Sequence, residues 1–500
     1  MLAGCPNGTN GPFPDPTVVV TDRAIVHGTI GDGIRKFSGI PYAAPPTGPN
    51  RFRAPQLPPA LLSLFEATKL GNACPQSPVF GHNQTSEDCL TLNVTTPHPV
   101  GSNLPVMVWI HGGGFIFGAG ADVDVTNAVK TGNIVVVTLN YRLGLLGFLA
   151  ASALDDGSES TGHTGNYGIA DQQFALKWVN RNIKSFGGDP ANVTIAGESA
   201  GAFSVCAHLV SPGSAGLFHR AIVQSGPCAH PYDTVAKKKQ YAAGDQIAQK
   251  LNCTGTDAQV ATCLRSTALP VSAFLAAQAN FAIKLGPSVG GTDIPDQPVT
   301  GLGHVPLLLG GTQLEAGVFI TKPYPTKDTY GPLITILFPM THDTVLTLYP
   351  YANYSSGFVA IATVLTDNLD FAPISPCYNA ASWLKAAPLN PVYAYEFSEP
   401  VPQVVPSFPG GPLHATELPY LFPPPGGPPS DPALSSAMIR YWTNFVRSGD
   451  PNVSGMPMSP PLAPWPPFKK NQDVLQLGPS IQPVDVYATH NCAFWNGFPH

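Results

Sequence analysis

The chain has 500 residues and a formal net charge of -6, and only 11% of its residues are charged. This balance offers no basic surface to nucleic acid or to an anionic membrane. No run of 18 or more apolar residues occurs, so we expect no membrane-spanning helix. The hydrophobic fraction of 43% is ample for a large core.

Apolar runs recur along the chain, separated by polar and helical segments. Alternation of Val and Ile with polar residues over 17–30 predicts a hairpin. Continuous apolar runs predict buried strands at Pro105–His111, Ile134–Leu139, Val193–Ala196, Ala221–Val223, Pro306–Leu309 and Val392–Phe397. Helical spacing of apolar residues predicts helices at Ala170–Ile183 and Phe203–Leu209. Apolar strands that alternate with helices predict an α/β fold, with a mostly parallel central sheet and helices on both of its faces.

No internal repeat and no clean linker divides the sequence. The 56 Pro and 50 Gly residues are spread between apolar segments, which indicates long loop insertions on a globular frame. The Pro-rich stretch Glu399–Pro432 has the composition of a linker, but it carries His414, so we interpret it as a stiff functional loop. We therefore expect a single domain over residues 1–500.

Residues 197–201 read Gly-Glu-Ser-Ala-Gly and fit the pattern G-x-S-x-G. A chance match is common in a chain with 50 Gly. Here, however, the pattern follows a predicted strand and precedes a predicted helix, as a nucleophile elbow requires. Such a turn presents its serine outward and needs small flanking residues, because strand and helix come close together. Ser199 is the predicted nucleophile.

A serine nucleophile needs a base and a carboxylate that orients the base. Glu315 follows the predicted strand Pro306–Leu309, and His414 lies on the loop after Val392–Phe397. The order Ser, Glu, His is one that an elbow serine in an α/β fold uses. Rival interpretations remain open for both partners: a surface acid for Glu315, and an exposed loop histidine for His414. Other candidate acids are Asp293, Asp296 and Glu396.

Further motifs occur in order along nearly the whole chain. They are Phe37–Arg51, Glu87–Leu90, His111–Phe115, Gly165–Gln173, Gly197–Gly201, Gly311–Gly317, His414–Tyr420, Tyr441–Phe445, Gly449–Asn452 and Trp465 with Pro466. By this set the chain resembles the type-B carboxylesterase/lipase family, the α/β-hydrolases that include cholinesterases and fungal lipases. The resemblance implies an α/β-hydrolase fold in one catalytic domain, hydrolysis of carboxylic esters through an acyl-enzyme, and a triad of Ser199, His414 and Glu315.

Three consecutive glycines, residues 112–114, follow the predicted strand that ends at His111. An oxyanion hole needs backbone N–H groups that no side chain obstructs, which glycines provide. The resemblance implies that the donors are the amides of Gly113, Gly114 and Ala200. Glu198 is expected to be a buried hydrogen-bonded partner rather than a catalytic acid, and Ser225 is expected to lie near the acid.

The nine cysteines contain no C-x-x-C pair, and the chain has neither H-E-x-x-H nor a nucleotide-binding glycine motif. We therefore expect no metal and no cofactor. The resemblance implies the disulfides Cys74–Cys89, Cys253–Cys263 and Cys377–Cys492. Of the remaining cysteines, Cys206 is expected to be a buried thiol, and whether Cys5 and Cys228 pair is left open.

Disulfides form in oxidising compartments, so these pairs predict a secreted protein. Seven N-x-S/T sequons point the same way, at Asn7, Asn83, Asn93, Asn192, Asn252, Asn353 and Asn452. The expected partner is a small-molecule ester, with no nucleic acid and no membrane span.

The loop between Cys74 and Cys89 corresponds to the lid of family members that act at lipid interfaces. It is short and mostly polar, and only Val79 and Phe80 are apolar enough to meet lipid. It also lacks a tryptophan of the kind cholinesterases use for quaternary ammonium groups. We therefore expect an open-site esterase for soluble short-chain, medium-chain or aryl esters, hydroxycinnamate esters among them. The alternatives are a lipase or sterol esterase with a minimal lid, and a non-catalytic adhesion relative.

Overall fold

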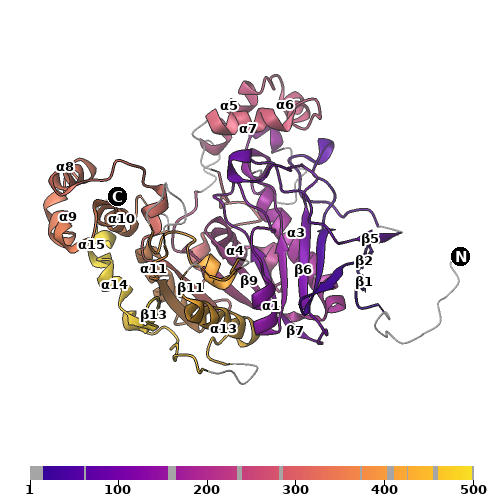
Figure 1. Ribbon diagram of the computed structural model, residues 1–500. Coiled ribbons are helices and arrows are strands. Elements are labelled where there is room, and N and C mark those ends of the chain that lie inside the picture. The colour runs from indigo at the N-terminus through magenta and orange to yellow at the C-terminus, as the bar shows by residue number, and fades with distance from the viewer. Residues whose placement is uncertain are drawn as a thin grey trace, which may run out of the picture.

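The computed structural model describes residues 15–60, 63–155, 165–233, 239–280, 285–371, 374–402, 410–424, 426–428, 430–453 and 460–497. An 11-stranded sheet crosses its centre in the order β14-β13-β12-β11-β10-β9-β7-β8-β6-β4-β3 (Figure 1). These strands are β3 (Thr29–Gly31), β4 (Ile34–Pro41), β6 (Thr91–Pro97), β7 (Leu104–Ile110), β8 (Val135–Leu139), β9 (Gly188–Glu198), β10 (Arg220–Gln224), β11 (Leu307–Thr312), β12 (Val392–Phe397), β13 (Val474–Leu477) and β14 (Gln482–Val484). From β8 to β13 the neighbours pair in parallel, and the outer pairs are antiparallel.

The two faces of the sheet are buried under different helices, as the alternation of side chains along each strand requires. Ile110 and Ile195 pack into one core with α3 (Tyr167–Asn182), α4 (Ala200–Val210) and α11 (Pro376–Ala386). Trp109 and Ala196, one residue away on the same strands, pack into a second core with α1 (Thr126–Gly132) and α13 (Pro432–Ser448). This double burial explains why the strands are apolar throughout.

Smaller groups of elements surround the sheet (Figure 1). The other helices are α2 (Gly144–Phe148), α5 (Lys239–Lys250), α6 (Asp257–Leu264), α7 (Val271–Asn280), α8 (Lys327–Leu337), α9 (His342–Leu348), α10 (Gly357–Asp367), α12 (Leu418–Leu421), α14 (Val486–Thr489) and α15 (Cys492–Asn496). The strands β1 (Val18–Val20), β2 (Ile25–His27) and β5 (Leu64–Glu66) form a separate small sheet. Figure 1 shows α5, α6 and α7 together above the sheet, and α8, α9 and α10 together beyond one of its edges.

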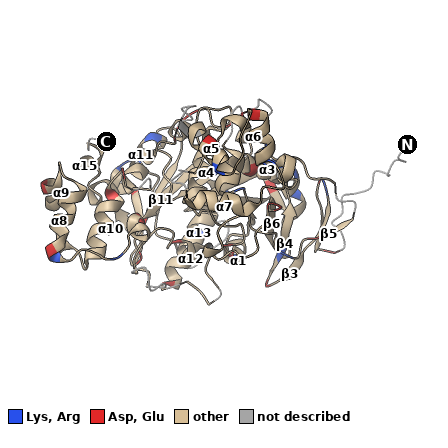
Figure 2. Ribbon diagram, turned by 90° about the horizontal axis from the view of Figure 1, so that it is seen from above, with Lys and Arg blue, Asp and Glu red and all other residues tan. Residues whose placement is uncertain are grey.

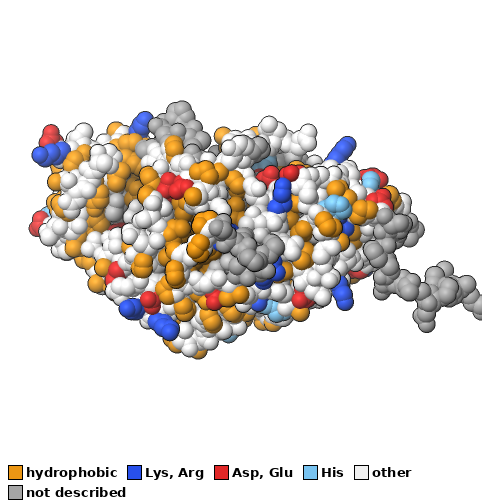
Figure 3. All heavy atoms as spheres, turned by 60° about the horizontal axis from the view of Figure 1, so that its bottom comes forward, with side chains coloured by type: hydrophobic (Ala, Val, Ile, Leu, Met, Phe, Trp, Pro, Cys, Tyr) orange, Lys and Arg blue, Asp and Glu red, His pale blue; other side chains and the backbone are white. Residues whose placement is uncertain are grey.

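Charged side chains are sparse on the surface, as the composition requires. The ribbon in Figure 2 marks several charged residues in α8 and α9. On the face seen in Figure 3, hydrophobic side chains are mixed with uncharged polar ones, and acidic and basic groups are few. Among the described residues, no helix combines the length and hydropathy that crossing a bilayer demands.

The predicted α/β-hydrolase architecture is confirmed. Each predicted strand overlaps an observed one, and β12 has the predicted bounds. The predicted hairpin corresponds to β1 and β2, which pair antiparallel. The largest difference in extent is at β9, which begins at Gly188, five residues before the predicted start at Val193. Residues 189–192, Asp-Pro-Ala-Asn, form no apolar run, so this first part of the strand, which is only partly buried, was not predicted.

Four disulfides link described parts of the chain. Cys74–Cys89, Cys253–Cys263 and Cys377–Cys492 are the pairs that the resemblance implies. The fourth, Cys206–Cys228, corrects the expectation that Cys206 is a free buried thiol. Cys206 lies on α4 and Cys228 follows β10; because β9 and β10 are parallel neighbours, the segments after them meet at one edge of the sheet. Cys5 lies outside the described residues.

Candidate active site

Ser199 occupies the turn between β9 and α4 with φ 54° and ψ −123°, a left-handed conformation that is strained for a residue with a side chain. Its backbone N–H donates to the Gln224 carbonyl at 2.9 Å. A Cβ on Gly201 would lie 2.0 Å from the Ile110 carbonyl oxygen, and one on Gly197 would lie 2.5 Å from the Gly201 oxygen. Glycine is therefore required on both sides of this serine, as the sequence pattern predicts.

His414 and Glu315 meet although 99 residues separate them. The His414 Nδ1 atom lies 2.6 Å from Oε2 of Glu315. The other carboxylate oxygen, Oε1, accepts the Thr312 backbone N–H at 2.7 Å. The Glu315 side chain is fully buried, and that of His414 is 10% exposed. Glu315 opens a 3₁₀ turn, Glu315–Phe319, that begins three residues after the end of β11, so the end of that strand determines where the carboxylate lies.

The second ring nitrogen of His414 faces the elbow that carries Ser199. Oε1 of Glu198, the residue before Ser199, lies 3.2 Å from Nε2 of His414. Burial lowers the pKa of His414, but the charges of Glu198 and Glu315 outweigh that effect and raise the pKa to about 9. Burial raises the pKa of Glu198 to about 7, with His414 opposing the shift and Glu315 adding to it. Protons are therefore shared within one cluster of carboxylates and imidazole.

The loop of three glycines at residues 112–114, here called the glycine loop, borders the turn that carries Ser199. A Cβ on Gly112 would lie 2.7 Å from Oε2 of Glu198 and 3.2 Å from Cβ of Ser199. Gly113 and Gly114 both have positive φ angles, 100° and 59°. Within the described part of the chain, no acceptor occupies the N–H groups of Gly113, Gly114 or Ala200, the first residue of α4. These three amides remain available to a ligand beside Ser199.

The rival acids lie elsewhere. Glu396 pairs with His490 at 2.6 Å, Asp296 is exposed, and the Asp293 carbonyl accepts from Ser211. Of the four candidate acids, Glu315 is the one in contact with His414. Ser225 is buried at the end of β10 with φ 53°, and its N–H donates to the Gly310 carbonyl on β11, the strand that leads to Glu315.

One carboxylate near His414, that of Glu417, was not predicted from the sequence. Glu417 is fully buried, and its Oε1 accepts from Gln224 at 3.1 Å, while Oε1 of Gln224 accepts from Trp442 at 2.9 Å. Burial raises the pKa of Glu417 to about 8. Glu417 could have been found from its position three residues after His414, because a short turn places residues at that spacing near each other. Within the described ranges, no group of three or more His, Cys, Asp or Glu side chains is arranged to hold a metal ion.

An aromatic ring and a tethered loop border the site. The Phe319 ring centroid lies 5.8 Å from that of His414, and Phe319 is 58% exposed. The Cys74–Cys89 loop is held by Gln76, whose side chain donates to the Gly118 carbonyl and accepts from the Gly118 N–H. Val79, on the same loop, is 80% exposed. The loop is therefore tied to the segment that follows the glycine loop.

Comparisons with known proteins agree with this geometry. A family model described as "Carboxylesterase family" matches residues 15–338 and 352–495. Para-nitrobenzyl esterase of Bacillus subtilis (strain 168) is 33% identical over 88% of this chain and 91% of its own length. Bile salt-activated lipase of Mus musculus is 34% identical over 86% of this chain and 77% of its own length. A solved thermophilic PNB esterase superposes with a TM-score of 0.79 at 29% identity, covering 96% of this chain and 99% of its own. The chain therefore belongs to the carboxylesterase family and is a serine hydrolase of carboxylic esters with the α/β-hydrolase fold.

Proposed function

We propose that the chain hydrolyses soluble esters with short, medium or aryl groups by means of a Ser199–His414–Glu315 triad. The observation that carries the triad is the 2.6 Å contact between His414 and the fully buried Glu315, at the edge of the sheet where the elbow presents Ser199. Glu315 holds the imidazole in one tautomer and stabilises the imidazolium that forms when His414 takes the serine proton.

The reaction has two halves. Ser199 Oγ attacks the ester carbonyl while His414 accepts its proton, and the same proton then leaves with the alcohol as the acyl-enzyme forms. Water, deprotonated by His414, attacks the acyl carbonyl, and the acid leaves as Ser199 recovers its proton. In both halves the negative oxygen is stabilised by the N–H groups of Gly113, Gly114 and Ala200, and loss of one such donor costs about 3–4 kcal/mol.

The preference for soluble esters is supported by the tethered loop. Interfacial lipases expose apolar surface when a lid moves, whereas here Gln76 bonds the Cys74–Cys89 loop to the backbone at Gly118. A loop of this length buries little apolar area. The half-exposed Phe319 ring beside His414 offers an apolar or aryl group a face to pack against. These features favour an open site over an interfacial one.

A lipase or sterol esterase with a minimal lid is the second candidate. Its support is the 34% identity to a protein named bile salt-activated lipase. Rate measured against substrate concentration across the solubility limit separates the two: a jump at the limit indicates interfacial activation, and a smooth saturation curve indicates an esterase.

We further propose that the protein is secreted, because four disulfides need an oxidising compartment to form and persist. Detection of the native enzyme in culture medium, with all four pairs oxidised by peptide mapping, tests this. Native enzyme found only inside cells with free thiols contradicts it.

The activity is tested with p-nitrophenyl acetate, butyrate and palmitate, methyl ferulate and an emulsified triglyceride, each with Ser199→Ala as the control. We expect the short and aryl esters to be turned over fastest and the variant to be inactive. A preference for palmitate and triglyceride replaces the esterase with the lipase. Equal rates for wild type and Ser199→Ala on every substrate refute the triad.

A further inference from the structure

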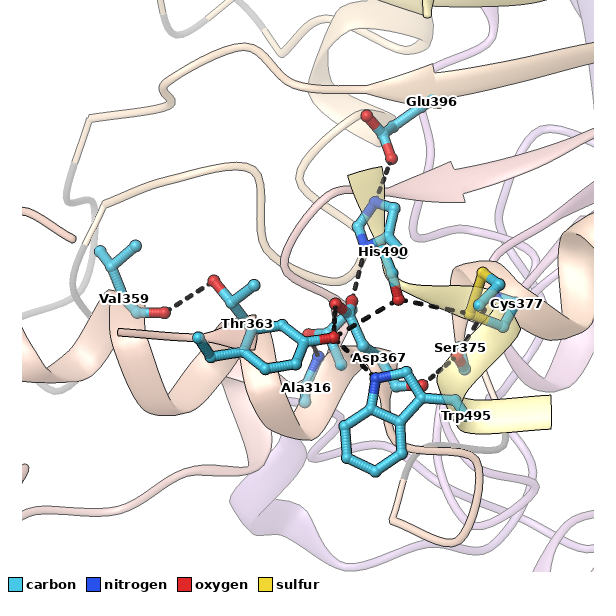
Figure 4. Close-up of polar contacts among 12 residues, drawn as sticks. Ala316, Val359, Thr363, Asp367, Ser375, Cys377, Glu396, His490 and Trp495 are labelled. Carbon is cyan, nitrogen blue, oxygen red and sulfur yellow. Dashed lines mark hydrogen bonds and ion pairs between the residues drawn. A yellow bond between two sulfur atoms is a disulfide. The ribbon is translucent and has the colours of Figure 1, made fainter. Parts of the chain in front are cut away.

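His490 lies between two buried carboxylates, far in sequence from the elbow (Figure 4). Its Nδ1 is 2.5 Å from Oδ1 of Asp367, the last residue of α10, and its Nε2 is 2.6 Å from Oε1 of Glu396 on β12. All three side chains are at least 97% buried. The cluster therefore joins the C-terminal segment to the end of α10 and to the central sheet.

The contacts define the charge on this imidazole. A neutral imidazole has one N–H, so it can donate to one of two carboxylates but not to both. Both ring nitrogens of His490 face carboxylate oxygens at hydrogen-bond distance, which requires the cationic form for two ionised partners. Burial lowers the pKa of His490, but Asp367 and Glu396 raise it well above its usual value. Burial raises the pKa of Asp367 and His490 opposes that shift, so the cationic imidazole is what compensates the two carboxylates when both are ionised.

The second oxygen of Asp367 is bound by a tyrosine. Oδ2 accepts the Tyr349 hydroxyl at 2.7 Å, and that hydroxyl accepts the Trp495 indole N–H at 2.7 Å. Burial, with the charge of Asp367 adding to it, raises the pKa of Tyr354 to about 12. By contrast, Oε2 of Glu396 has no hydrogen-bond partner among the described residues. Glu396 therefore depends on His490 for compensation more than Asp367 does.

This cluster is joined to the acid of the proposed triad by one buried hydrogen bond. The N–H of Ala316, the residue after Glu315, donates to Oγ1 of Thr366 at 2.9 Å, and Thr366 precedes Asp367 on α10. A second connection runs through the sheet, because Glu396 pairs with Gly311 on β11, the strand that ends three residues before Glu315.

We propose that His490 is a positioning residue for Glu315: by holding Asp367 and Glu396 together, it keeps Thr366 against the Ala316 N–H and so keeps the Glu315 carboxylate on His414. This inference rests on the proposed triad. Loss of the cation leaves two anions facing each other without compensation, and their repulsion moves the end of α10 away from β12. The 3₁₀ turn at Glu315 then loses its anchor.

The test compares wild type with His490→Gln, which keeps a hydrogen-bonding side chain without the charge. Active sites are counted with a phosphonate that labels Ser199. We expect kcat per labelled site on p-nitrophenyl butyrate to fall about 10- to 100-fold, the range that a small displacement of a catalytic group produces. KM should change less than about twofold, because uniform substrate binding is untouched. The acidic limb of the kcat/KM profile should move to lower pH, because His414 loses part of its contact with Glu315.

Two further variants make the result specific. In His490→Gln with Glu396→Gln, one of the two uncompensated anions is removed, and kcat should recover in part. Trp495→Phe loses the indole N–H in the same C-terminal segment without changing the charges, so it should lower the melting temperature and leave kcat per labelled site and the acidic limb as in wild type.

If His490→Gln does not fold, Thr366→Val tests the link directly. Thr366→Val removes the hydroxyl that accepts the Ala316 N–H at nearly constant volume. It should lower kcat and move the acidic limb of the kcat/KM profile to lower pH, as His490→Gln would. Thr366→Ser keeps the hydroxyl and should have the kcat and the acidic limb of wild type. The proposal is overturned if a folded His490→Gln or Thr366→Val has the kcat and the acidic limb of wild type. The cluster then has a purely structural role. Failure of the triad itself is distinct, because wild type would then match Ser199→Ala.

Discussion

Glu198 and Glu315 contact opposite nitrogens of one imidazole: Oε1 of Glu198 lies 3.2 Å from Nε2 of His414, and Oε2 of Glu315 lies 2.6 Å from its Nδ1. In the proposed triad, the nitrogen that receives the proton of Ser199 therefore faces a carboxylate from the elbow itself. Both anions stabilise the protonated ring, which raises its pKa and sets the pH at which the base form appears.

Glu198→Gln should move the acidic limb of kcat/KM to lower pH. The base form of His414 is lost as pH falls through its pKa, which the structure raises to about 9, and removal of the Glu198 anion lowers that pKa. The limb is measured with p-nitrophenyl butyrate between pH 5 and pH 10. Glu417→Gln is the matched control and should give a smaller shift in the same direction, because Glu417 contributes less to the pKa of His414. If the acidic limb of kcat/KM does not move in Glu198→Gln, then the Glu198 anion does not raise the pKa of the catalytic base as expected.

Glu315→Gln should reduce kcat by about 10⁴-fold, as loss of the orienting carboxylate does in other serine hydrolase triads. The amide no longer stabilises the imidazolium and can hold the ring in the wrong tautomer. Asp296→Asn, at the exposed candidate acid, should keep wild-type kcat. A large loss in Asp296→Asn with none in Glu315→Gln would reverse the two roles.

Gly113→Ala should lower kcat by about 10²- to 10³-fold, the effect of losing an oxyanion donor. The new Cβ would lie 2.1 Å from the Phe117 carbonyl oxygen, so the loop must move and the amide with it. Gly33→Ala separates this effect from backbone strain, because Gly33 also has a positive φ, 73°, but has open space around it. It should cost stability and leave kcat unchanged; equal kcat in both variants would falsify the role of the glycine loop.

Replacement of both Cys206 and Cys228 by alanine should lower the free energy of unfolding by about 3 kcal/mol, the loop-closure value for a separation of 22 residues. The measurement is urea unfolding followed by fluorescence. Peptide mapping of the wild type should recover the Cys206–Cys228 peptide pair, and recovery of two free thiols instead shows that the disulfide does not form.

Glycans should occur on a subset of the sequons. Asn83, Asn252 and Asn353 are exposed and accessible to glycosylation. The side-chain amides of Asn93, Asn192 and Asn452 donate to Thr138, to the Arg447 carbonyl and to Asp450 and the Trp465 carbonyl. Mass spectrometry of glycopeptides from a secreting eukaryotic host should find the first three occupied and the second three bare. Occupancy of Asn93, which lies within β6, is the clearest contrary result.

The fold could be predicted well because its signals are local. Continuous apolar strands report burial on both faces, and each predicted strand overlaps an observed one. Of the helices, only α3 and α4 were predicted; α5–α10, for example, have short amphipathic patterns and pack in small clusters beside the main core. The start of β9 was not predicted either, because this partly buried segment has no apolar run.

The sequence by itself determined the local structure around Ser199, the proposed nucleophile. The elbow and the glycine loop are short-range patterns, because a sharp turn or a free amide needs particular residues at adjacent positions, whereas Ser199, Glu315 and His414 were related only by their order along the chain. Only the tertiary structure decided which acid meets His414, that Cys206 meets Cys228, and that His490 lies between Asp367 and Glu396. The reason is topological: a parallel sheet brings the ends of strands far apart in sequence to one edge, and no local pattern records which side chains meet there.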